Sequence, residues 1–218
     1  MVARFRSPHR SQEPHGDGRD RPRRGGCTAS QNCGSVASAS GFGAAGNAWA
    51  PAKDRRGVEV VKIDLPEPAT RQNLLDAYAA AFTANPKLKV VLLTHLSHRT
   101  GLVLPVAEIA RMARTRGIDV ILDAAHSWGQ VEFNPRDLGI DFIGFNLHKW
   151  IGAPIGAGFL YIAKDRLADI DRNKADEDFP EADIRSRVHT GTVNFATVLT
   201  IPAALETARR TWRGSVMT

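Results

Sequence analysis

The chain has 218 residues, 43% of them apolar, which is enough to bury one sizeable core in one or two domains. Its formal net charge of +6 comes mainly from arginines before residue 25, and acids and bases nearly balance from about residue 57 onward. The basic excess therefore describes an N-terminal segment, and no nucleic-acid partner is expected for the folded part. No stretch approaches the roughly 18 apolar residues that a membrane span requires.

The two cysteines, Cys27 and Cys33, have no cysteine or histidine partners at metal-binding spacing. The sequence thus gives no disulfide framework and no metal site, and a reducing cytoplasm fits. Arg23 and Arg24, followed by small residues, resemble a twin-arginine export signal. Polar residues interrupt the apolar region that such a signal needs, so we expect a cytoplasmic protein without a membrane partner.

Residues 1–45 are rich in Arg, Gly, Ser and Pro and show no hydrophobic periodicity. This composition predicts a disordered segment that is unrelated to the fold, with the folded part covering residues 46–218.

Strand and helix patterns alternate from about residue 57 to residue 165. Short β-branched or continuous apolar runs predict strands at 58–65, 89–96, 119–125, 141–147 and 157–163. Apolar residues at helical spacing predict helices at 71–82 and 104–117, the second of which stops at Gly117. The alternation predicts an α/β fold with a mostly parallel sheet flanked by helices, and the remainder from about Lys164 is expected to be mostly helical.

Three of these strands end in residues that carry chemistry. The strand at 89–96 runs into His95, Ser97 and His98; the strand at 119–125 carries Asp123 and leads to His126; the strand at 141–147 leads through Asn146 to His148 and Lys149. Ligands of open α/β sheets gather at the carboxyl ends of the strands. Each side chain could alone be structural, but together they form a coherent set.

The chemistry that this set suits is a Schiff base. A lysine amine of lowered pKa can condense with an aldehyde, and pyridoxal 5′-phosphate is the obvious candidate. Asp123 could hold the pyridine nitrogen of that cofactor protonated. Asn146 and His148 could hold its phosphate, and the glycines after Lys149 let the backbone pass close to it.

The stretch "ILDAAHSWGQVEFNPRDLGIDFIGFNLHKWIGAPIGAGFLYI" (121–162) resembles the core of the class V aminotransferase family of fold-type I pyridoxal-phosphate enzymes. The form "NLHKW..AP.G.GFLY" is most similar to isopenicillin N epimerase-like proteins, and cysteine desulfurases are a more distant relation. The resemblance runs from about residue 46 to residue 210. It implies the large domain of that fold and an amino acid as substrate.

The resemblance also implies roles for individual residues. Lys149 would form the Schiff base and move the proton at the substrate α-carbon, and Asp123 would pair with the pyridine nitrogen. His126 stands where the family binds the ring hydroxyl, and His98 stands where relatives often have an asparagine near the substrate carboxylate. Asn146 and His148 would hold the phosphate. Thr192, in "HTGTVN", resembles a residue that reaches the phosphate of a partner subunit, which implies a homodimer.

The sequence also departs from the family pattern. Family members are roughly twice as long, with a C-terminal domain that supplies an arginine for the substrate carboxylate. Their phosphate loop and ring-stacking residue should fall within residues 1–45, where no matching motif stands. We therefore expect an incomplete large domain that binds the cofactor weakly and turns over slowly or not at all.

Two other interpretations remain open. "GFGAAG" (41–46), with Asp64 about twenty residues on, matches the fingerprint of a nicotinamide-dependent dehydrogenase, but "GSVASAS" before it is a poor strand and Pro51 follows closely. A non-catalytic remnant or interaction protein is the second alternative. A cysteine desulfurase is disfavoured, because no cysteine follows Cys33.

Overall fold

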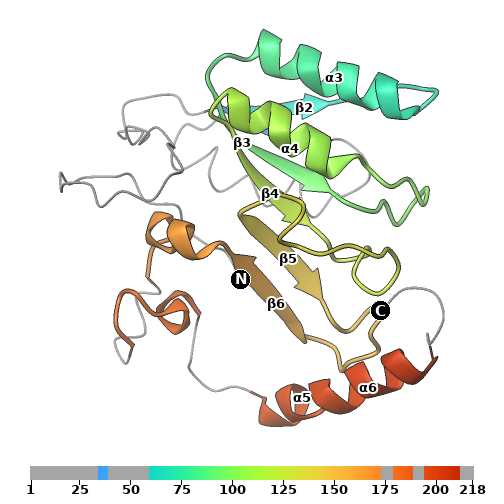
Figure 1. Ribbon diagram of the computed structural model, residues 1–218, viewed down its shortest axis with the longest axis vertical. Coiled ribbons are helices and arrows are strands. Elements are labelled where there is room, and N and C mark those ends of the chain that lie inside the picture. The colour runs from blue at the N-terminus through green and yellow to red at the C-terminus, as the bar shows by residue number, and fades with distance from the viewer. Residues whose placement is uncertain (1–33, 39–58, 173–178, 189–193, 212–218) are drawn as a thin grey trace. The chain divides into compact units, whose positions relative to one another are not determined.

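The computed structural model describes residues 34–38, 59–172, 179–188 and 194–211 (Figure 1). The chain divides into two compact units, which are described separately. One comprises Asn32–Ala163 with Asn194–Thr218, and the other comprises Met1–Gln31 with Lys164–Val193.

The first unit contains a six-stranded sheet with the order β2-β1-β3-β4-β5-β6. Its strands are β1 (Gly34–Ser38), β2 (Glu59–Ile63), β3 (Leu88–Thr94), β4 (Asp119–Asp123), β5 (Phe142–Asn146) and β6 (Gly158–Ile162). β1 to β5 pair in parallel, and β6 pairs antiparallel with β5. The predicted mostly parallel α/β sheet is confirmed, and each of the five predicted strands is present.

β1 is a strand that the sequence analysis does not predict. Gly34–Ser38 pairs in parallel with β2 on one side and with β3 on the other. The expectation that everything before residue 46 is unrelated to the fold is therefore wrong for these five residues. Its sequence, GSVAS, has a single β-branched residue, so the strand depends on its two neighbours rather than on propensity. The rest of the segment 1–45 lies outside the described residues.

Two helices follow the predicted pattern. α3 (Arg71–Ala84) begins at Thr70, whose hydroxyl accepts a hydrogen bond from the Asn73 N–H at 3.1 Å, and it buries Leu74, Tyr78 and Phe82. These three residues recur every four positions, which places them on one helix face. α4 (Val106–Thr115) buries Val106, Ile109, Ala110 and Ala113 and is followed by Gly117 at φ 74°. Only a residue that tolerates positive φ ends a helix in this way at low cost.

α3 and α4 lie side by side over one face of the sheet (Figure 1). Their buried residues form one core with Val91 and Leu93 of β3, Val120 and Leu122 of β4, and Ile143 and Phe145 of β5. The residues between these on each strand point to the opposite face, where Leu92, Ile121 and Gly144 are only partly buried. The functional side chains described below belong to this second face and to the strand ends.

The C-terminal helices α5 (Phe195–Leu199) and α6 (Ile201–Thr211) belong to the same unit. A second, smaller core joins Ala208, Ile201, Ala204 and Leu205 of α6 to Leu147, Ile151, Ala153 and Ala157, which follow β5. α6 thus supports the turn that carries Lys149. The expectation of mostly helical structure after Lys164 is met in the described residues.

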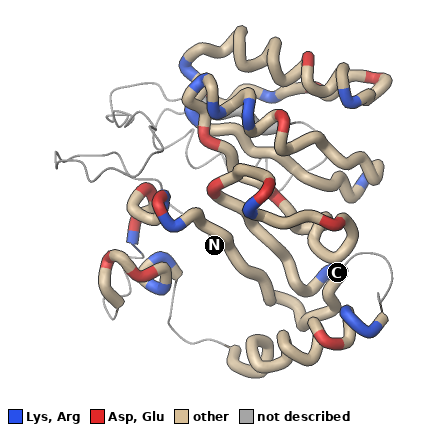
Figure 2. The backbone as a smooth tube through the Cα atoms, in the orientation of Figure 1, with Lys and Arg blue, Asp and Glu red and all other residues tan. Residues whose placement is uncertain are grey.

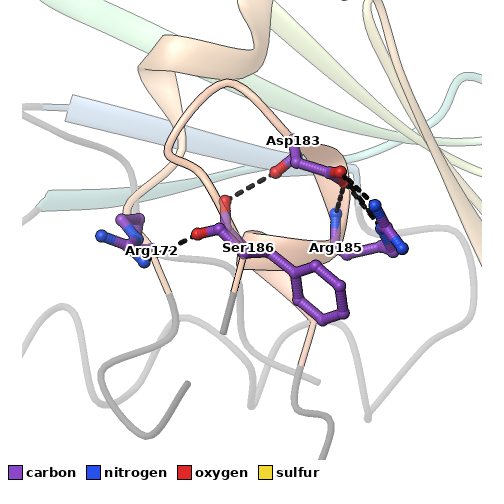
Figure 3. Close-up of polar contacts among 5 residues, drawn as sticks. Arg172, Asp183, Arg185 and Ser186 are labelled. Atoms are coloured by element: carbon purple, nitrogen blue, oxygen red, sulfur yellow. Dashed lines mark hydrogen bonds and ion pairs between the residues drawn. The ribbon is translucent and has the colours of Figure 1, made fainter. Parts of the chain in front are cut away.

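The described part of the second unit contains two short 3-10 helices, Lys164–Asp169 and Ile184–Arg187. Asp183 begins the second one, and its Oδ1 accepts hydrogen bonds from the N–H of Arg185 at 2.8 Å and from its Nε at 3.1 Å (Figure 3). These bonds lower the pKa of Asp183 to about 2. Arg172 donates to the carbonyl of Phe179 at 2.9 Å, which connects two described parts of this segment.

Acidic and basic positions are interspersed over the described residues, and β5 and β6 carry neither (Figure 2). This distribution agrees with the expectation that the basic excess lies in the N-terminal segment. In the ranges that the structure describes, no helix is long and apolar enough to cross a membrane.

Candidate active site

Three parallel strands bring the candidate residues to one edge of the sheet. Thr94 of β3 is the register partner of Asp123 on β4, and Asp123 is in turn the partner of Gly144 on β5. Beyond the register, the His95 N–H donates to the carbonyl of Asp123 at 2.9 Å, and the Ala124 N–H donates to the carbonyl of Gly144 at 2.9 Å. The loops that carry His98, His126 and Lys149 therefore start from fixed and adjacent points.

Lys149 and His126 are in direct contact. Lys149 Nζ lies 2.8 Å from His126 Nε2, and both side chains are half-buried. The ring of His98 stacks on that of His126, with centroids 5.2 Å apart and planes inclined by 19°. An amine and two imidazoles thus form a continuous row across the ends of β5, β4 and β3.

Burial and nearby charges shift the pKa values of Lys149 and His126. Burial lowers the pKa of the Lys149 amine, and the charge of Asp123 raises it in part. Burial is also the largest cause that lowers the pKa of His126. The positive charges of Lys149 and His98 lower it further, and the charge of Asp123 raises it. A lysine of lowered pKa has a larger fraction of the free amine, which is the form that attacks a carbonyl.

Asp123 is held in place by its own loop. Its Oδ1 accepts a hydrogen bond from the Ala125 N–H at 2.9 Å, two residues further on. This local turn fixes the carboxylate at the end of β4. The orientation matters because Asp123 is the acidic member of the set and lies near both Lys149 and His126, whose pKa values it affects.

The sheet face beside Asp123 is open over Gly144. Among the described residues, no heavy atom lies within 4 Å of the position that a Cβ at Gly144 would take. Register partners point to the same face of a sheet, so this space is next to the Asp123 side chain. Gly144 therefore places no side chain beside Asp123 on this face.

The remaining predicted residues are not part of the row that Lys149, His126 and His98 form. Asn146 is half-buried at the end of β5, on the same face as Gly144. His148 turns to the following loop, where its Nδ1 lies 3.2 Å from the carbonyl oxygen of Ala157. Thr192 lies outside the described residues. His95 belongs to the core instead of the row: it is buried and packs edge-on against Phe133, with ring centroids 4.7 Å apart.

Comparison with known proteins agrees with the fold. The chain is similar in fold to a cystine C-S lyase, C-DES, which was solved with glycine covalently linked to its pyridoxal-phosphate cofactor. The TM-score is 0.70 at 24% identity, and the match covers 83% of this chain and 50% of C-DES. The cysteine desulfurase CsdA from Escherichia coli gives a TM-score of 0.67 at 24% identity, over 80% of this chain and 45% of the other. The fold is that of the large domain of fold-type I pyridoxal-phosphate enzymes.

The family described as aminotransferase class-V matches residues 33–213. The chain therefore belongs to the class V aminotransferase family, whose cofactor is pyridoxal 5′-phosphate. The match begins at residue 33, before the predicted boundary at residue 46, and includes β1.

Curated relatives of this chain differ in the reaction that their names give. It is 35% identical to an isopenicillin N epimerase from Streptomyces clavuligerus over 124 residues, which are 56% of this chain and 31% of the relative. It is 37% identical to a putative L-cysteine desulfhydrase 1 from Oryza sativa subsp. japonica over 117 residues, 51% of this chain and 24% of the relative. The matched region thus spans about a third or less of these relatives.

The dehydrogenase alternative is affected in two ways. "GSVAS" does form a strand, so one objection to a dinucleotide fingerprint at 41–46 is removed. The glycines themselves lie outside the described residues. The family match, which runs through this segment, assigns the chain to a different class.

Proposed function

We propose that this chain carries the lysine-bearing part of the active site of a pyridoxal-phosphate enzyme that acts on an amino acid, of the aminotransferase or epimerase type. One observation carries the proposal: Lys149 Nζ lies 2.8 Å from His126 Nε2, at a sheet edge where Asp123 influences the charge of both. Few surface lysines have an imidazole partner, a lowered pKa and a nearby carboxylate together.

The side chains present suit this cofactor. An amine of lowered pKa suits its aldehyde, a fixed carboxylate suits its pyridine nitrogen, and Gly144 places no side chain beside that carboxylate. When bound, pyridoxal 5′-phosphate acts as an electron sink that stabilises negative charge at the α-carbon of an amino acid. The protein supplies binding, orientation and proton transfer.

Each side chain then has a role. Lys149 would hold the cofactor at its aldehyde and move the proton at the substrate α-carbon, and Asp123 would keep the pyridine nitrogen protonated. His126 would bind the ring hydroxyl, and His98 would lie near the substrate carboxylate. Asn146 and His148 would hold the phosphate, and Nε2 of His148 would serve this role because its Nδ1 faces the carbonyl of Ala157.

The proposal extends to a second subunit. Thr192 would reach the phosphate bound by the partner in a homodimer with shared sites. Sedimentation of the chain with and without pyridoxal 5′-phosphate tests this part, and a monomer under both conditions would contradict it.

Selective capture of the cofactor tests the central claim. The chain is mixed with pyridoxal 5′-phosphate and reduced with borohydride, and the modified lysine is located by peptide mass spectrometry. We expect the adduct at Lys149, its loss in Lys149→Arg, and no change in Lys89→Arg, which alters an exposed lysine on β3. Adducts spread evenly over the lysines would refute the proposal and favour a non-catalytic protein.

A second candidate is cleavage of the carbon–sulfur bond of cysteine, as the names of the desulfhydrase relatives indicate. Elimination from cysteine with water yields sulfide, ammonia and pyruvate and needs no protein thiol, so the lack of any cysteine after Cys33 does not oppose it. Incubation with L-cysteine and with other L-amino acids distinguishes the two: sulfide and pyruvate indicate elimination, whereas the D-isomer or an oxo acid indicates epimerase or aminotransferase chemistry.

A further inference from the structure

The stacked histidines, His98 and His126, are a feature of the row that the proposed function does not explain. A single residue at position 126 is sufficient to face the ring hydroxyl of a cofactor. A second imidazole packed flat against it, with centroids 5.2 Å apart, adds another group that can take a proton. In this arrangement the charges of the two imidazoles and of the Lys149 amine affect one another.

The contact between Lys149 and His126 defines which ring must be neutral. A lysine ammonium has three donors and no acceptor, so a charged Lys149 can bond to His126 Nε2 only if that nitrogen carries no proton. A neutral His126 with its proton on Nδ1 satisfies this condition. The ammonium must lose a proton before its nitrogen can attack an aldehyde, and Nε2 at 2.8 Å is within reach to accept it when that nitrogen is unprotonated.

The stacking brings His98 close enough to affect the charge of His126. His98 is exposed and His126 is half-buried. A positive charge on His98 opposes a second charge on the ring stacked against it, through repulsion at short range, and so lowers the pKa of His126. His98 therefore favours the neutral form of His126.

We propose that His98 is a positioning residue which, by stacking on His126, keeps that imidazole neutral as the proton acceptor for Lys149. The inference rests on the proposed role of Lys149 as the amine that captures an aldehyde. In the step, the proton passes from Lys149 Nζ to His126 Nε2 and the nitrogen lone pair becomes free; His126 then returns the proton to water.

The groups that face His126 come from all three strand ends. Lys149 and His98 lower its pKa through their positive charges, in addition to burial, and Asp123 opposes them. In a variant that lacks the charge of His98, only Lys149 lowers the pKa of His126 through its charge, and Asp123 still raises it. The pKa of His126 should therefore rise. The change should be visible in the imidazole signal of His126 itself.

Nuclear magnetic resonance titration of the histidines in the full chain provides the test. In His98→Phe, which retains a flat ring without a charge, and in His98→Asn, which retains a polar group, we expect the midpoint of His126 to move up by about half a pKa unit or more, about threefold in the equilibrium. Arg99→Gln removes a neighbouring exposed charge outside the stack and should leave that midpoint in place.

A second measurement reports on Lys149. Reductive alkylation with propionaldehyde and cyanoborohydride, read by mass spectrometry at Lys149, should be slower than wild type in both His98 variants below the His126 midpoint, by up to about threefold. The rates should converge near about pH 9, where all the imidazoles are neutral. An unchanged His126 midpoint in both variants would overturn the inference, as would an unchanged alkylation profile.

These outcomes can be distinguished from failure of the proposed function. Propionaldehyde carries no phosphate or ring, so it reports on the amine whether or not the chain holds pyridoxal 5′-phosphate. If the cofactor modifies lysines without selectivity while the His98 variants shift both profiles, the proposed function fails and the histidine coupling stands. If Lys149 captures the cofactor selectively but neither profile moves, the histidine coupling fails and the proposed function stands.

Discussion

Two glycines on neighbouring strands show how differently the same residue can be constrained. A Cβ at Gly158 of β6 would lie 2.7 Å from the carbonyl oxygen of Phe145, a backbone atom that cannot move aside. A Cβ at Gly144 of β5 would meet no described atom within 4 Å. The first glycine is required by the pairing of β5 and β6, and the second leaves space at the site.

We therefore expect Gly158→Ala to lower the free energy of unfolding by roughly 1–3 kcal/mol, because overpacking against the backbone strains the strand pair. Gly144→Ala should change it by less than about 0.5 kcal/mol while weakening capture of pyridoxal 5′-phosphate at Lys149. Urea unfolding of both variants measures the first effect, and borohydride trapping measures the second. Equal stabilities for the two variants would contradict the assignment.

His95 gives the protein a pH-dependent stability at the residue level. It is buried, and its Nδ1 has no hydrogen-bond partner among the described residues. Burial lowers its pKa from 6.5 to about 4. Between these two values the unfolded chain binds a proton that the folded chain does not, so the stability contributed by His95 is complete above pH 6.5 and decreases as the pH falls toward 4.

The expected loss across this window is on the order of 2–3 kcal/mol, from the linkage between pKa and stability. Urea unfolding at pH 7 and at pH 4.5, for wild type and for His95→Gln, measures it. The variant cannot titrate at this position, so its stability should fall less over the same interval. Parallel pH profiles for the two proteins would show that another group is responsible.

At the scale of elements, α3 begins with a side-chain cap that can be tested by itself. The Thr70 hydroxyl accepts the Asn73 N–H at 3.1 Å, which satisfies one of the amides left unpaired at a helix start. Thr70→Ala should cost about 1 kcal/mol of stability. Thr83→Ala, in the last turn of the same helix, loses only a bond from its hydroxyl to the Ala79 carbonyl and should be neutral or slightly stabilising.

The elements were largely predictable because their patterns are strong. Tyr78 and Phe82 recur at helical spacing, and Leu92 and Leu93 lie in a continuous apolar run, so α3 and β3 follow from hydrophobic period alone. The sequence does not predict β1, because GSVAS has little apolar character and takes its conformation from β2 and β3. Tertiary pairing overrides weak propensity in such a strand.

The site was predictable as a set of residues but not as a set of contacts. That Asp123, His126 and Lys149 meet at one edge follows from parallel strands ending together. The 2.8 Å contact between Lys149 and His126 and the stacking of His98 depend on loop conformations that no periodicity encodes. The burial of His95, three residues before His98, likewise depends on the turn between them.

At the scale of the whole molecule, the sheet depends on its first strand. β1 is the described strand that joins β2 to the rest, since β2 pairs with β1 and β1 with β3. A chain that begins at Gly46 loses β1 and leaves unpaired edges on β2 and β3. A chain that begins at Asn32 retains it.

We expect the chain that begins at Gly46 to aggregate and to lose cooperative unfolding, whereas the chain that begins at Asn32 should unfold at a temperature close to that of the full chain. Size-exclusion chromatography and thermal melts of the three proteins at equal concentration measure this. A monomeric protein beginning at Gly46 with an unchanged melting temperature would show that β1 contributes little.

The position of β1 also has a consequence for synthesis on the ribosome. Gly34 pairs with Glu59 on one side and with Leu88 on the other, so β1 is inserted between two strands that are synthesised after it. Such non-local pairing is slow, because a long intervening segment must lose conformational entropy before the strands make stabilising contacts. Until β3 leaves the ribosome, the nascent chain exposes an open strand edge, and this interval is when a chaperone would have most effect on its yield.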